Sequence, residues 1–198
     1  MTDWTSLTYA VVDVEGNGQQ PPDLVELAVV PIAGGVIGEP RSWLVRPERS
    51  IKSFATRIHG ITNDDVANRP PFADIADEVR SALDVTALIA HNAHVDTGVL
   101  KRELDDWQCP EVFDTLKLAR RLLPKQDGYQ LGMLVRALDL AIGIPADLTP
   151  HRAAYDALVT ARLFVRLATI TEGHPLTLEA LRNSKPVSER DDEASSLF

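Results

Sequence analysis

The acidic residues of the segment VVDVEG are placed where they could do chemistry. Asp13 and Glu15 are spaced by two at the end of a run typical of a β-strand, so both side chains leave the same face. Two like charges on a half-buried strand repel each other, and burial adds to the cost. A divalent cation would remove that cost, whereas a strand end at which both carboxylates reach water would avoid it.

Two more aspartates and a histidine lie at positions that could complete such a site. Asp96 and Asp156 each fall on the leucine-bearing side of a predicted helix, away from open solvent. His151 precedes Asp156 by five residues, with Thr149 as the predicted N-cap of that helix. Five residues correspond to about 140° on an ideal helix, so His151 can share a site with Asp156 only by leaning in from the helix end. Taken singly, each residue is more typical of a cap or a surface position.

Other ligand-binding patterns fit the same segment poorly. Asp13, Glu15, Asn17 and Gly18 match the opening of an EF-hand loop, except for Glu at the third position. The twelfth position is Leu24 where a bidentate Glu is required, and a strand precedes the loop where a helix is required. The glycines that follow lack the spacing of a phosphate-binding or dinucleotide-binding loop.

Short β-branched runs alternate with helical periodicities, which predicts an α/β fold, a mixed sheet flanked by helices. A capping box at Thr62 and Asp65 predicts a short helix that ends before Pro70, and Asn92 is a predicted N-cap. The expected strands are 7–14, 24–32, 36–45, 86–90 and 112–113, and the other expected helices are 72–83, 92–107, 115–123, 129–142 and 151–170.

The composition is that of a globular protein with one domain. The chain has 198 residues, 44% of them hydrophobic and 25% charged. Residues 1–182 are the predicted domain, and the polar, acidic residues 183–198 are a predicted disordered tail. Cys109 is the single cysteine, which excludes an intrachain disulfide and a cysteine-based zinc site. With neither a leader pattern nor a run of about 20 apolar residues, we expect a cytoplasmic protein without membrane contact.

The net charge of −9 argues, at first, against a nucleic-acid partner. The charge is unevenly distributed, however, because residues 117–166 contain eight basic and four acidic residues. We predict a track for a phosphate backbone in this stretch, although basic helix surfaces are often merely solvated. The residues of the predicted track are Lys117, Arg120, Arg121, Lys125 and Arg152.

Three motifs in this order, DVEG, HNAHVD and HRAAYD, resemble the histidine subclass of the DEDD exonuclease superfamily. That superfamily includes the proofreading (epsilon) subunit of bacterial DNA polymerase III, ribonuclease T and oligoribonuclease. The stretches LVELAVV, RIHGIT, FDTLKLARRLLP and YQLGMLVRAL are also similar to the family, so the resemblance covers about residues 8–170. It implies a ribonuclease-H-like fold.

The resemblance further implies hydrolysis of phosphodiester bonds with two divalent ions, Mg²⁺ or Mn²⁺. Asp13 would bridge both ions, Glu15 and Asp156 would complete the first site, and Asp96 would serve the second through water. His151 would take the proton from the attacking water. The implied substrate is the 3′ end of a single-stranded nucleic acid, with DNA favoured and nucleoside 5′-monophosphates as products.

The backbone at Gly16 and the residues His59 and Ile61 are predicted to cradle the terminal nucleotide. Two positions depart from the family pattern: Gly16 replaces a common Thr, and Val95 replaces a Phe that stacks on a base, a contact worth about 1–3 kcal/mol. A DNA polymerase subunit is a candidate partner. The alternatives are an RNA-trimming exonuclease, a non-catalytic polymerase-accessory subunit that binds nucleic acid, and a phosphoesterase for small molecules.

Overall fold

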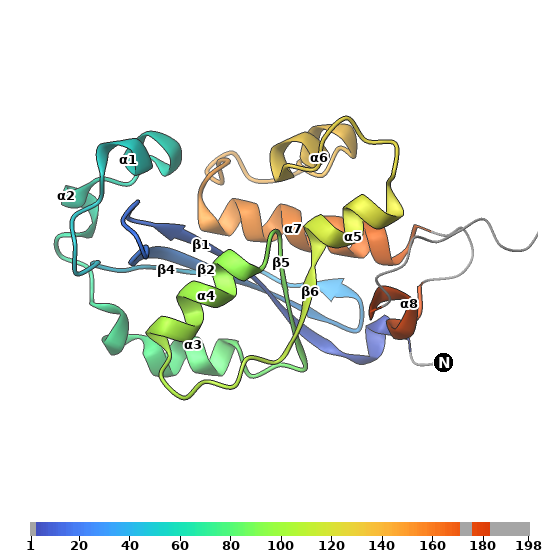
Figure 1. Ribbon diagram of the computed structural model, residues 1–198, viewed down its shortest axis with the longest axis horizontal. Coiled ribbons are helices and arrows are strands. Elements are labelled where there is room, and N and C mark those ends of the chain that lie inside the picture. The colour runs from blue at the N-terminus through green and yellow to red at the C-terminus, as the bar shows by residue number, and fades with distance from the viewer. Residues whose placement is uncertain (1–2, 171–175, 183–198) are drawn as a thin grey trace, which may run out of the picture.

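The computed structural model describes residues 3–170 and 176–182, which form a six-stranded mixed sheet between helices (Figure 1). The order across the sheet is β3-β2-β1-β5-β6, with β4 also paired to β2. Strands β1 to β4 pair antiparallel, and β1, β5 and β6 pair parallel. The predicted fold class is confirmed. The strands are β1 Thr8–Gly16, β2 Leu24–Ala33, β3 Val36–Ile37, β4 Arg41–Leu44, β5 Ala87–Ala90 and β6 Glu111–Asp114.

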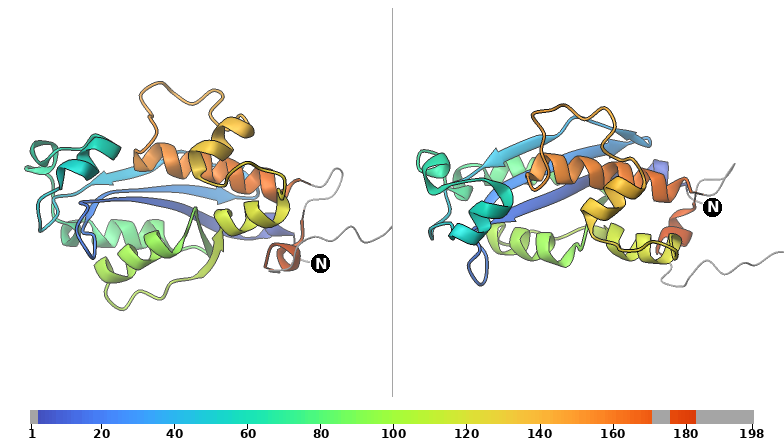
Figure 2. Two further views of the ribbon diagram at one scale, coloured as in Figure 1. Left: turned by 45° about the horizontal axis from the view of Figure 1, so that its top comes forward. Right: turned by 90° about the horizontal axis from the view of Figure 1, so that it is seen from above.

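Helices cover both faces of the sheet. The longest, α7, lies with α6 on one face, and α3 and α4 lie on the other (Figure 2). Helix α7 is apolar on most sides because it is packed between the sheet and the helices α5 and α6. The helices are α1 Ser53–His59, α2 Asn63–Val66, α3 Ala76–Ala82, α4 His94–Glu103, α5 Thr115–Leu122, α6 Leu131–Ala137, α7 Ala153–Ala168 and α8 Leu178–Arg182, with 3-10 turns η1 Trp4–Ser6 and η2 Phe72–Asp74.

The central strand β1 separates two hydrophobic clusters. Its side chains alternate, so Tyr9 and Val11 pack towards α7, and Ala10 and Val12 pack towards α3 and α4. Burial on both faces explains why the strand reads as a continuous apolar run. A third, smaller cluster holds α1 and α2 against β2, and its buried members are Val25, Ile51, Ala55, Ile61 and Val66.

Several predicted boundaries are wrong for local reasons. The expected strand 36–45 is divided into β3 and β4, where Gly38 packs against Pro31 so closely that a Cβ would lie 2.8 Å from its Cγ. Asn92 does not cap α4: it has φ 67°, and Asp114 accepts the Asn92 backbone N–H instead. The expected helix 129–142 shrinks to α6.

Helix α1 was not predicted, whereas the capping box that starts α2 is confirmed. Helix α1 is only seven residues long and ends at Gly60, whose φ of 78° suits glycine. Asp65 N donates to Thr62 Oγ1 at 3.3 Å, and Thr62 N donates to Asp65 Oδ2 at 2.8 Å. Within the described part of the chain, no helix has the length and apolarity needed to cross a membrane. The predicted tail, residues 183–198, lies outside the described residues.

Candidate active site

Asp13 and Glu15 lie near the end of β1 and face the layer that contains α7. The alternation that buries Tyr9 and Val11 beneath α7 carries both carboxylates to the same face, as predicted. Parallel pairing with β5 extends only from Tyr9 to Val11. The carboxylates therefore stand where β1 runs beyond its parallel neighbour.

Asp156 reaches this place from the first turn of α7. Its carboxylate oxygen and those of Asp13 and Glu15 lie within 4.8 Å of one another, a grouping that could hold a metal ion. Asp96 comes from α4, on the opposite layer, and meets β1 where β5 no longer pairs with it. Its Oδ1 accepts a hydrogen bond from Val14 N at 3.1 Å, and the residue is 5% exposed. Three elements thus bring four carboxyl groups to one end of the sheet.

These carboxyl groups have raised pKa values because they are buried close together. Burial is the main cause for Asp13, whose pKa lies well above its usual range, and the charges of Asp96 and Asp156 add to it. Burial raises the pKa of Glu15 to about 8, that of Asp96 to about 7 and that of Asp156 to about 6. Such a cluster is stable only when protons or cations neutralise it. Its oxygen-only donor set is the kind that hard divalent cations prefer.

Glu26 is a buried anion beside the site that the sequence analysis did not single out. It lies opposite Glu15 in the β1–β2 register and is 4% exposed. Arg152 donates to it from Nε at 3.0 Å and Nη2 at 2.6 Å, and Ala153 N donates at 3.0 Å. Glu26 therefore holds the start of α7. Arg152, which was predicted to belong to a phosphate track, is paired with Glu26, and 40% of its side chain remains exposed.

His151 precedes α7 in a left-handed turn with φ 63°, which is uncommon for a non-glycine residue. The helix starts at Ala153 with Arg152 at the N-cap position, so the predicted cap at Thr149 is wrong. The turn lets His151 N donate to Asp156 Oδ2 at 3.1 Å, while the side chain of His151 is exposed. His151 thus approaches Asp156 from the helix end, the arrangement that the five-residue spacing requires.

The predicted nucleotide-cradling residues differ in their exposure. Gly16 follows an irregularity in the β1–β2 register, and a Cβ there would lie 3.0 Å from Pro22 Cβ, which explains the absence of a larger residue. His59 is 5% exposed, and its Nδ1 accepts a hydrogen bond from Ile61 N at 3.0 Å. Ile61 packs in the third cluster. Both side chains are buried, and Nε2 of His59 has no hydrogen-bond partner among the described residues.

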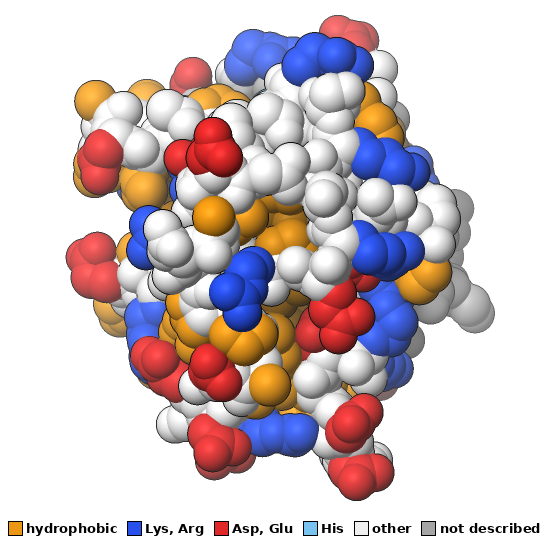
Figure 3. Space-filling view, turned by 90° about the vertical axis from the view of Figure 1, so that its left-hand side faces the viewer, with side chains coloured by type: hydrophobic (Ala, Val, Ile, Leu, Met, Phe, Trp, Pro, Cys, Tyr) orange, Lys and Arg blue, Asp and Glu red, His pale blue; other side chains and the backbone are white. Residues whose placement is uncertain are grey.

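Apolar side chains are exposed near the site, and two of them, Phe54 and Ile58, were not singled out in the sequence analysis. Phe54 and Ile58 stand one turn apart on α1, with 46% and 54% of their surfaces exposed. The Phe54 ring lies against Gly18, in the loop that follows β1. Val95, next to Asp96, is 45% exposed. The end of the molecule that carries α1 shows hydrophobic side chains inside a central hollow, with acidic and basic side chains around it (Figure 3).

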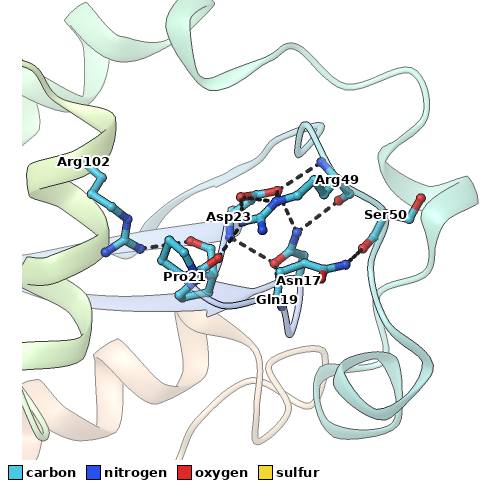
Figure 4. Close-up of polar contacts among 8 residues, drawn as sticks. Asn17, Gln19, Pro21, Asp23, Arg49, Ser50 and Arg102 are labelled. Atoms are coloured by element: carbon cyan, nitrogen blue, oxygen red, sulfur yellow. Dashed lines mark hydrogen bonds and ion pairs between the residues drawn. The ribbon is translucent and has the colours of Figure 1, made fainter.

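A polar network anchors the loop after β1 (Figure 4). The buried Asn17 donates from Nδ2 to Asp23 Oδ2 at 2.8 Å and to Arg49 O at 3.1 Å, and its Oδ1 accepts from Asp23 N at 3.0 Å. Arg49 forms an ion pair with Asp23, and Lys52 N donates to Asn17 O at 3.0 Å. The loop next to the carboxylates is thereby tied to the segment that leads into α1.

Comparison with known proteins identifies the family. The protein-family model of RNase_T, described as Exonuclease, matches residues 10–164. The chain belongs to this exonuclease family. The DEDD resemblance seen in the three motifs is therefore confirmed, and this exonuclease-family chain places the motif carboxylates on β1, α4 and α7.

Curated relatives of the exonuclease chain are much longer proteins. It is 37% identical over 182 residues to the 3′-5′ exonuclease DinG of Bacillus subtilis, covering 88% of this chain and 19% of DinG. It is 31% identical over 182 residues to a PolC-type DNA polymerase III of Streptococcus pneumoniae, covering 88% of this chain and 12% of that protein. The chain thus spans less than a fifth of either relative.

Solved structures of similar chains include one that this chain covers almost completely. Exonuclease X, in complex with 5′-overhanging duplex DNA, is 34% identical with a TM-score of 0.71, and the match covers 87% of this chain and 96% of that one. Escherichia coli exonuclease I, in complex with a dA16 oligonucleotide, is 21% identical with a TM-score of 0.66, covering 83% of this chain and 41% of that one. The second likeness shows the fold alone.

Proposed function

We propose that this chain is a metal-dependent 3′-to-5′ exonuclease that removes nucleoside 5′-monophosphates from the 3′ ends of single-stranded DNA. The observation that carries the proposal is the cluster of four carboxyl groups from β1, α4 and α7, whose pKa values are raised mainly by burial. A structural role gives no reason to bury four acids together. The match to Exonuclease X bound to DNA supports DNA as the substrate.

Each residue of the site has a role in this proposal. Asp13, Glu15 and Asp156 would hold one divalent ion, and Asp96 would contribute to a second, with Mg²⁺ or Mn²⁺ suited to these oxygen donors. When bound, such ions neutralise the negative charge of the phosphodiester and activate water. His151, exposed beside Asp156, would accept the proton of the attacking water.

The walls of the site fit a single strand better than a mononucleotide. Phe54 and Ile58 offer apolar surface to unpaired bases. The match to a PolC-type polymerase supports a DNA polymerase as partner, which co-purification with a polymerase core would test.

The direct test is digestion of a 5′-labelled DNA strand with Mg²⁺ or Mn²⁺. We expect a ladder of shortened products and release of 5′-monophosphates, both abolished by EDTA and by Asp13→Asn. The matched control is Asp77→Asn, an exposed acid on α3, which should keep wild-type activity. Activity of the Asp13→Asn variant comparable with wild type would refute the assignment.

The substrate alternatives are separated in the same assay by presenting matched single-stranded DNA, duplex DNA with a 3′ overhang, and RNA. Faster digestion of RNA would replace the proposal with an RNA-trimming activity. Competition by mononucleotides as strong as that by oligomers would indicate a small-molecule phosphoesterase. Binding without cleavage by the metal-loaded wild type would indicate a non-catalytic subunit.

A further inference from the structure

A basic pocket of about 880 Å³ lies at the outer side of β6, next to the site but separate from its carboxylates. Its lining comes from the start of α4, from β6, from α5 and from α8. Lys117, Arg120, Arg121 and Arg182 supply its cations, and Val112 and Phe113 supply part of its apolar base. Of the predicted phosphate track, Lys117, Arg120 and Arg121 line this pocket, and Lys125 is not among the lining residues.

The acidic residues of the pocket already have partners of their own. Glu111 is paired with Arg182, with Arg182 Nε and Nη2 each 2.7 Å from a carboxylate oxygen. Asp114 Oδ1 accepts backbone N–H groups from Asn92 at 3.1 Å and from Leu116 at 2.9 Å. Neither carboxylate therefore forms an ion pair with Lys117, Arg120 or Arg121 among the described residues.

Three cations of the pocket form no ion pair within residues 3–170 and 176–182. Lys117 and Arg120 are exposed on α5. Arg121 donates from Nη2 to Leu181 O at 3.3 Å, but its Nε is buried and has no acceptor among the described residues. Burial also lowers the pKa of Arg121, because the cation has lost water. An anion in the pocket would compensate all three.

The pocket and the candidate active site share the first turn of α4. His94 and Thr97 line the pocket, and Asp96 lies between them in the same helical turn. Neighbouring side chains of a helix point in different directions, and Asp96 is turned to Val14 N of β1, not into the pocket. The carboxylates and the pocket therefore lie on different sides of this turn, and only a strand of several nucleotides could contact both.

We propose that this pocket binds nucleic-acid backbone phosphates that lie outside the bond being cleaved. The inference rests on the proposed function and adds a second anchoring site to it. We favour a nucleic acid over an acidic peptide as the ligand, because the protein has to hold a polyanion that its own carboxylate cluster repels. In a chain of net charge −9, attraction has to come from a separate group of cations. The phosphates belong to the cleaved strand or to its complement.

The test measures DNA binding by fluorescence anisotropy in an Asp13→Asn background, so that no substrate is consumed. The pocket variant is Lys117→Gln with Arg120→Gln, and the control is Lys101→Gln with Arg136→Gln, which changes two exposed cations outside the pocket. The probes are a 4-nucleotide strand, a 20-nucleotide strand and a hairpin duplex with a short 3′ overhang, each titrated over a series of salt concentrations.

We expect the pocket variant to bind the 20-nucleotide strand or the hairpin about tenfold more weakly, with unchanged binding of the 4-nucleotide strand. The slope of log K against log salt should fall by about 1.4 for a single strand, since each phosphate contact contributes about 0.7. A loss confined to the hairpin assigns the phosphates to the complementary strand, and a loss on both long probes assigns them to the cleaved strand.

Equal affinity and equal salt slope of the pocket and control variants would overturn the inference. Weakened binding of an acidic peptide without any effect on DNA would overturn it in favour of a protein partner. The result is separable from the proposed function: if wild-type protein degrades DNA and the pocket variant binds it normally, only the pocket assignment fails. Far-ultraviolet circular dichroism and thermal unfolding establish that the variants are folded.

Discussion

The carboxylate cluster should make the metal-free protein less stable as the pH rises, and Asp13→Asn should remove much of that loss. The site acids have higher pKa values in the folded state than in the unfolded state. At a pH between the two values, the folded state therefore binds more protons. The linkage relation then requires the free energy of unfolding to fall as the pH rises from about 4 to about 8. At about pH 4 the site acids of the folded protein are protonated or nearly so. Divalent metal ions should restore it.

The size of the effect follows from the raised pKa values. A change for Glu15 from 4.5 to about 8 corresponds to about 5 kcal/mol of unfavourable interaction in the charged form. Burial is the main cause of the raised pKa of Asp13, and the charges of Asp96, Asp156 and Glu15 add to it. Its neutral replacement should therefore recover part of the lost free energy of unfolding at pH 8 and almost none at pH 4.5.

The measurement is urea unfolding in EDTA from pH 4.5 to 8.5, for wild type, Asp13→Asn and the exposed control Asp77→Asn. The observable is the difference in the free energy of unfolding between each variant and the wild type. Burial lowers the pKa values of His59 and His91, so these groups make the protein more stable as the pH rises towards about 6.5. The subtraction removes this contribution. Saturating Mg²⁺ at 100 times its dissociation constant should stabilise the wild type by about 2.7 kcal/mol. A pH-independent difference between Asp13→Asn and wild type would refute the reasoning.

Three further predictions follow from the surroundings of the site. Glu26→Ala leaves the guanidinium of Arg152 unpaired and should lower the free energy of unfolding by about 2 kcal/mol, as judged by urea unfolding, with Glu26→Gln losing less. Phe54→Ala should raise KM for single-stranded DNA about tenfold with kcat within twofold, measured in steady state, and a pure kcat effect would contradict base contact. Asn17→Ala should cost about 2 kcal/mol and lower kcat/KM, because Asp23 and backbone groups lose the partner that the buried Asn17 provides; an unchanged unfolding midpoint would count against the network.

Sequence periodicity located most elements because they obey simple burial rules. Apart from Glu26, strand β2 reads as apolar because α7 covers it on one face and α3 and α4 lie beneath the other. Helix α1 gave no comparable signal, since Phe54 and Ile58 leave one side of it apolar and exposed. The break between β3 and β4 also depends on Pro31, a residue of the neighbouring strand, and could not be read locally.

The candidate site shows the same division between features that follow from local sequence and features that depend on tertiary contacts. The alternation of Asp13 and Glu15 fixed their common face, because a strand has a period of two whatever it packs against. Asp96 and Asp156 could be joined to them only through a family resemblance, since nothing local tells a helix where its first turn will be docked. The buried pairing of Glu26 with Arg152 went unnoticed because its members are 126 residues apart in the chain.

The sequence by itself determined the chemistry available to this protein: carboxylates at strand and helix ends, a histidine beside a helix start, and an uneven charge along a chain of net charge −9. Only the tertiary structure decided which charges act together. It brought four acids to the end of β1, committed Arg152 to Glu26, and left Lys117, Arg120 and Arg121 around one pocket. The physical reason is that residue types and periodicities are local, whereas burial, pairing and electrostatic compensation depend on distances that folding sets.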